Sequence, residues 1–71
     1  MNKKNVLKII REGDYVAEVS VELTYSDDSW APYLSVVDAQ KLDDVRETLR
    51  RGDVEAAAQL ARVYRLTPVF A

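Results

Sequence analysis

The chain has 71 residues, no cysteine and no histidine, and a net charge of −2. This length predicts a single domain over residues 1–71 with a thin core, because so short a chain buries only about 60% of its unfolded surface. The missing cysteines exclude disulfides and thiolate metal sites, and no apolar run approaches the ~18 residues of a membrane span. The N-terminus also lacks the features of a signal peptide. We therefore expect a cytoplasmic protein with no membrane partner.

Charge is distributed unevenly along the chain. Residues 1–12 carry a net +3, residues 13–45 a net −7, and residues 46–71 a net +2. An acidic middle argues against broad, non-specific binding of nucleic acid and suits a basic partner.

Two strands are predicted in the first third of the chain. Residues 5–10 are rich in β-branched and aliphatic side chains, and Gly13 and Asp14 follow as turn residues. Residues 15–25 alternate with period two, which is typical of a strand with one wet face. The apolar face of that strand consists of Tyr15, Ala17, Val19, Val21, Leu23 and Tyr25. We expect an antiparallel hairpin whose apolar face needs a cover.

A helical hairpin is predicted to supply this cover. Ser35 and Asp38 resemble a capping box at the start of a helix that Gly52 ends. The apolar face of this first helix comprises Val36, Ala39, Leu42, Val45 and Leu49. Asp53 caps a second helix, and its shared face is expected to comprise Val54, Ala57, Leu60, Ala61 and Tyr64.

The last residues change period again and can add a short edge strand, since Thr67 precedes Pro68 and is therefore biased to extended structure. The predicted fold class is α+β, a small antiparallel sheet covered by a helical hairpin, in the order β-β-α-α-(β).

Few side chains in this sequence are suited to catalysis. Without His or Cys, the usual general base, thiol nucleophile and most zinc sites are missing. The pairs Asp27–Asp28 and Asp43–Asp44 do not have calcium-loop spacing. We expect no enzyme activity, no metal and no cofactor. A deep pocket lined by Asp28, Tyr33 and Lys41 would instead favour an enzyme.

The stretch SDDSWAPYLS, residues 26–35, favours a binding role. It lies between strand and helix, with Leu34 predicted to pack against the helix start and Pro32 to stiffen the crossing. Its aromatic residues either form a lid on the core or anchor a partner, as Trp and Tyr often do at interfaces. The predicted protein-interface residues are Trp30, Tyr33, Tyr25, Glu18 and Glu22. The thin core and open sheet edges favour a homo-oligomer or a protein partner.

A nucleic-acid-binding or transcriptional regulatory module is the alternative. Basic side chains cluster near the helix ends at Arg46, Arg50, Arg51, Arg62 and Arg65. Acidic residues among them make this surface less basic than a typical recognition surface.

Two resemblances accompany these patterns. The stretches EGDYVAEV, WAPYLS and DAQKLDDVRETLRRGDVEAAAQLARVYRLTPV look like those of small uncharacterised bacterial proteins. REGDYVAEVSVEL, residues 11–23, is similar to the hairpin of HicB-type antitoxins, although TYSDD follows where that family has a proline-glycine-cysteine stretch. The resemblance implies a non-catalytic, antitoxin-like component of a bacterial two-gene system.

Overall fold

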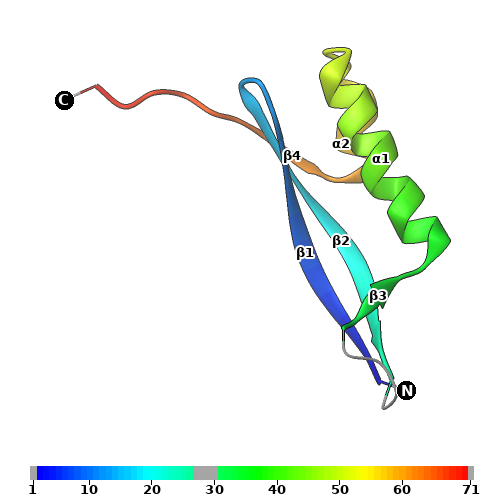
Figure 1. The fold of residues 1–71 in the computed structure, drawn as a ribbon. Coiled ribbons are helices and arrows are strands. Elements are labelled where there is room, and N and C mark those ends of the chain that lie inside the picture. The colour runs from blue at the N-terminus through cyan, green and yellow to red at the C-terminus, as the bar shows by residue number, and fades with distance from the viewer. Residues whose placement is uncertain (1, 27–30, 71) are drawn as a thin grey trace.

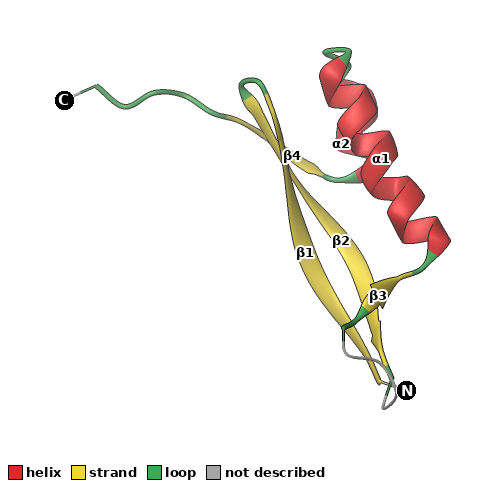
Figure 2. Cartoon of the chain, in the orientation of Figure 1, coloured by secondary structure: helices red, strands yellow, loops and turns green. Residues whose placement is uncertain are grey.

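A computed structural model describes residues 2–26 and 31–70, and four strands and two helices follow one another in this part of the chain (Figures 1 and 2). They are β1 (Asn2–Glu12), β2 (Tyr15–Tyr25), β3 (Tyr33–Leu34), α1 (Val36–Arg50), α2 (Val54–Leu60) and β4 (Arg62–Arg65). The strands form an antiparallel sheet, and the helical hairpin packs on it. The predicted α+β fold class is confirmed, with a short third strand added before the helices.

The β1–β2 hairpin forms the longest part of the sheet. The two 11-residue strands pair over their whole length, from Asn2 opposite Tyr25 to Glu12 opposite Tyr15. Gly13 has a φ of 60°, whereas no non-glycine residue described has a positive φ. In a two-residue turn, a positive φ at the first residue and not at the second is typical of type II′. The twist of this turn matches that of the flanking strands.

The second edge of β2 is shared between two short strands. β4 pairs with Tyr15–Glu18, and β3 pairs with Leu23 and Thr24. Between them, α1 supplies side chains in place of a strand. The Glu22 amide donates to Asp38 Oδ2 at 2.8 Å, and Lys41 Nζ donates to the Ser20 carbonyl at 3.0 Å. This edge is therefore largely closed, whereas no strand in the described part of the chain pairs with the outer edge of β1.

The core lies between β2 and the helices. The predicted alternation of β2 is confirmed, since Ala17, Val19 and Val21 are buried. From the helices, Val45 and Leu49 of α1 and Ala57 of α2 meet these side chains, and Ile10 of β1 completes the cluster. Only small and medium-sized side chains are buried in this way, so the core is thin.

Both ends of α1 follow the local sequence. The Asp38 amide donates to Ser35 Oγ at 3.1 Å, which confirms Ser35 as the N-cap. The Asp38 carboxylate accepts the Glu22 amide of β2, so it ties the helix to the sheet. At the other end, Gly52 has a φ of 79°, and the amides of Gly52 and Asp53 donate to the carbonyls of Leu49 and Thr48. These two bonds form a Schellman motif, and they confirm Gly52 as the residue that ends the helix.

The predicted apolar face of α1 is wrong at its first turn. Leu42, Val45 and Leu49 pack on the sheet as expected, but Val36 is 84% exposed and Ala39 is also exposed. β3 pairs with β2 over only two residues. The buried core includes Val45 and Leu49 from the later turns of α1 but no side chain from its first turn.

The predicted length of the second helix is also wrong. The α2 helix begins as expected, with the Ala56 amide donating to Asp53 Oδ1 at 3.2 Å, but it ends at Leu60. Ala61 is extended, and Val63 of β4 lies opposite Ala17 of β2. The pairing of β4 with β2 satisfies backbone groups at the sheet edge and packs Val63 on the core, and this outweighs the helix propensity of the alanine-rich run.

The molecule exposes more surface than a compact chain of its mass. Its accessible surface is 5551 Å², against about 4,500 Å² expected for a compact monomer of this mass. Its radius of gyration is 14.4 Å, against about 11 Å expected for a compact domain of this length. The smallest extent is 15 Å, the thickness of one sheet and one helical layer. Residues 66–70 lead away from this body (Figure 1).

Candidate protein-binding surface

The side of the sheet that faces away from the helices, here called the open face, is the first candidate surface. Directly opposed residues of paired strands share a face, and successive residues alternate between faces. The buried residues of β2 have odd numbers, so its even-numbered residues lie on the open face. The pairing register then places there the odd-numbered residues of β1 and, from β4, Arg62 and Tyr64.

Exposed apolar side chains lie on the open face beside the polar Glu18 and Ser20 of β2. Leu7 is 59% exposed, Ile9 62% and Tyr64 42%, while Val16 between β1 and β4 is half-buried. Val16 lies opposite Arg11 on one side and Tyr64 on the other. An isolated exposed aliphatic residue needs no explanation, but neighbouring ones on a single sheet face are typical of a binding surface.

Two shallow hollows lie around the second edge of β2, between the open face and the helices. A shallow hollow of about 380 Å³ is lined by Leu7, Ser20, Lys41 and Leu60, among others. A second hollow shares Leu60 and Lys41 and reaches Val36 and Val37 at the start of α1. Val37 is 76% exposed. The first hollow is also lined by Glu18 and Arg62, so polar and charged side chains separate the open face from Val36 and Val37 at the start of α1.

The outer edge of β1 is the second candidate feature. This strand carries Lys3, Lys4, Lys8 and Arg11, and all four residues are exposed. Lys3 Nζ lies 3.7 Å from Glu22 Oε1 across the hairpin. The only acid of β1, Glu12, is bound by Arg50. The free edge is therefore strongly basic.

The predicted interface residues lie in two places. Glu18 and Glu22 are on the open face, with Glu18 beside Ile9 and opposite Arg62. Tyr25 ends β2 and Tyr33 lies in β3; both are exposed in part, toward the end of the sheet away from the hairpin turn. Trp30 lies outside the described residues. The structure thus brings the two acids, but not the tyrosines, next to the exposed apolar side chains of the open face.

The five arginines of the alternative are dispersed and mostly engaged. Arg46 pairs with Asp43 at 3.3 Å, and Arg50 pairs with Glu12 at 3.2 Å and Glu47 at 3.8 Å. The Arg65 guanidinium lies 5.7 Å from the centre of the Tyr15 ring. Arg62 is on the open face opposite Glu18, while Arg51 caps the end of α1. No common basic surface is formed by this set.

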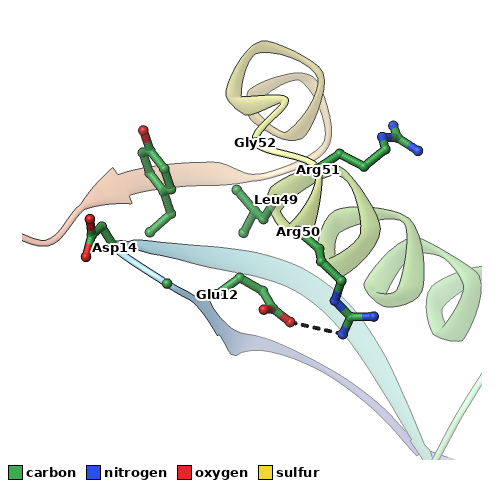
Figure 3. Close-up of a pocket in the computed structure, with 8 residues that line it drawn as sticks. Glu12, Asp14, Leu49, Arg50, Arg51 and Gly52 are labelled. Carbon is green, nitrogen blue, oxygen red and sulfur yellow. Dashed lines mark hydrogen bonds and ion pairs between the residues drawn. The ribbon is translucent and has the colours of Figure 1, made fainter.

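A depression of about 310 Å³ separates the hairpin turn from the α1–α2 turn (Figure 3). In Figure 3, Leu49 occupies its centre, the Arg50 guanidinium reaches the Glu12 carboxylate, and Arg51 points away. Glu12 and Arg50 pair with each other, while Asp14 and Arg51 lie on opposite sides of the depression, so its charged groups do not converge on one ligand position. Among residues 2–26 and 31–70, no cluster of three or more metal-binding side chains is found.

Leu7, Ile9 and Tyr64 are the surface residues that sequence reasoning missed. The run NVLKII holds apolar residues at positions 6, 7, 9 and 10, which cannot all lie on one face of a strand. This double-sided pattern was the available signal. Within the described residues, neither helix is long and apolar enough to span a membrane.

Comparisons with known proteins give no relative. No protein-family model, no curated protein and no solved structure matches this chain.

Proposed function

We propose that this protein is a non-catalytic protein–protein interaction module that binds its partner through the open face of the sheet. The single observation that carries the proposal is the presence on that face of exposed aliphatic and aromatic side chains from both strands that flank β2, Leu7 and Ile9 of β1 and Tyr64 of β4. Water contact at such side chains is unfavourable, and a partner that covers them gains about 25 cal/mol for each Å² of apolar surface removed from water.

The shape of the molecule supports a partner of ordinary size. The accessible surface exceeds that of a compact monomer by roughly 1,000 Å², part of which belongs to the exposed residues 66–70, and a standard interface buries about 800 Å² on each partner. The sheet has helices on one side only, so a partner on the open face would give it a second covering layer.

The finer proposal is an antitoxin-like component of a bacterial two-gene system, supported by the resemblance of residues 11–23 to HicB-type hairpins. These residues form the end of β1, the turn and most of β2, which includes Val16 and Glu18 of the open face. The partner is then the product of the adjacent gene.

Co-expression with that untagged product tests both levels. The open-face variant Leu7→Thr/Ile9→Thr places β-branched threonines, which suit a strand, at both positions of β1 and removes apolar surface. The control variant Val36→Thr/Val37→Thr changes two aliphatic residues of α1 that are more exposed than Leu7 and Ile9. We expect the parent and the control to co-purify with the partner, and the open-face variant to lose it while keeping its urea midpoint.

Two results would contradict these proposals. Retention of the partner by the open-face variant would exclude the open face as the binding surface. Absence of any complex with the adjacent product would exclude the antitoxin-like assignment.

A further inference from the structure

We infer that the partner adds an acidic, extended segment to the free edge of β1, antiparallel to that strand. This inference rests on the proposed function, which it deepens by naming the binding mode and the chemistry of the partner. Strand addition uses the unpaired backbone groups of an exposed edge for affinity and the alternating side chains for specificity.

The edge itself is the first argument. β1 has 11 residues in regular pairing with β2, and no described strand occupies its other side. At the other edge of the sheet, by contrast, most of the second edge of β2 is closed by β3, β4, Asp38 and Lys41. Among the described strands, β1 is the long strand with one edge unpaired over its full length.

The charges of β1 favour an acidic partner segment, in place of the basic partner that the acidic middle of the chain suits. Lys3 and Arg11 flank Leu7 and Ile9 on the open face, and Lys4 and Lys8 lie on the other face. A segment with acids opposite these four cations and apolar residues between them would match both faces of the strand. Cross-strand pairs of opposite charge stabilise a sheet, whereas like charges placed directly opposite destabilise it.

The same charges disfavour a second copy of this chain. A two-fold antiparallel pairing of β1 with itself has three long registers that keep the faces matched. They place Lys4 opposite Lys8, Lys3 opposite Arg11, or Lys8 opposite Lys8. Each long register therefore opposes cations, and the third also places Lys4 opposite Glu12, an acid that Arg50 already binds.

Edge lysines also protect natural sheets against aggregation, and that role accounts for the cations alone. It does not account for Leu7 and Ile9, which lie between those cations and are more than half exposed. An edge that only repels other strands gains nothing from two large aliphatic side chains beside it. A partner segment that pairs with the cations and covers Leu7 and Ile9 accounts for both kinds of exposed side chain on β1.

Synthetic peptides with the full-length protein test this inference. The acidic probe is Glu-Val-Ile-Glu-Val-Val-Thr-Glu-Glu, written to run opposite residues 11 to 3. The swap probe is Glu-Val-Ile-Lys-Val-Val-Thr-Lys-Glu, in which the residues opposite Lys8 and Lys4 are reversed. Titration followed by amide chemical shifts reports both affinity and location.

We expect the acidic probe to bind the parent protein about tenfold more tightly than the swap probe, from two reversed cross-strand pairs. Shifts should concentrate at residues 3–11. The variant Lys4→Glu/Lys8→Glu should reverse the preference by a similar factor. Both positions are exposed, and an unchanged urea midpoint will confirm that the variant is folded.

Several results would overturn the inference. They are equal binding of the two probes, shifts concentrated outside β1, a stable homodimer of the parent in sedimentation, or tighter binding of a twelve-residue oligothymidylate than of the acidic probe. If no probe binds while the open-face variant still loses its partner, strand addition is excluded and the proposed function stands.

Discussion

The two faces of one sheet differ sharply in this protein, although the same strands form both. On the helix side, Ala17, Val19 and Val21 are buried under Val45 and Leu49. On the open face, Leu7 and Ile9 occupy equivalent positions and remain in water. The difference teaches that apolar side chains on the first face hold the fold together, whereas those on the second are available for a partner.

Ile9 and Ile10 provide the largest and most direct contrast. They are adjacent in the chain, but Ile10 is 5% exposed and Ile9 is 62% exposed. We expect Ile10→Ala to lower the free energy of unfolding by about 3 kcal/mol, because it removes buried methyl groups and leaves a cavity. Ile9→Ala should cost under about 1 kcal/mol. Urea denaturation measures both, and equal losses would contradict the assignment of faces.

Asp38 tests how the helix side is attached. Asp38→Ala removes the acceptor for the Glu22 amide and an acid from the first turn of α1. The expected loss is about 1.5 kcal/mol, since hydrogen bonds to charged groups exceed neutral ones. Asp43→Ala, which removes only an exposed pair with Arg46, is the control and should cost less than about 0.5 kcal/mol. Indistinguishable urea midpoints would refute the tie between α1 and β2.

Gly52 tests the turn of the helical hairpin. A methyl group there meets no atom within 4 Å, so the cost of Gly52→Ala comes from the backbone, whose φ is 79°. We expect a loss of about 1 kcal/mol. Gly52→Asn should lose less, because asparagine tolerates this conformation better, and thermal unfolding of the two variants gives the order. A stabilising Gly52→Ala would show that the turn adopts another conformation.

The Glu12–Arg50 pair should have the smallest effect. It links β1 to α1 at 3.2 Å, but the Arg50 side chain is mostly exposed. We expect Arg50→Ala to cost at most about 0.5 kcal/mol at low salt and less at high salt. A loss above 2 kcal/mol in urea denaturation would mean that the pair is part of the structural core.

Sequence patterns predicted the covered face better than the open one. The alternation of residues 15–25 identified the buried residues of β2, and Ser35, Gly52 and Asp53 marked the helix ends correctly. These features depend on local geometry, which the sequence encodes directly.

Tertiary pairing decided the rest. The alanine-rich run predicted helix through Tyr64, but pairing with β2 turned Arg62–Arg65 into a strand. The apolar residues of β1 lie on both sides of the strand, and only the register with β2 shows that Leu7 and Ile9 face away from the helices. The binding surface could not be predicted without that register.

Photo-crosslinking in the native cell tests the central claim most directly. A benzophenone amino acid is placed at position 9 on the open face or at position 37 of α1, which is the more exposed of the two. The open-face account predicts one discrete crosslinked product at position 9 and none at position 37. A product at position 37 alone, or at neither position, would contradict it.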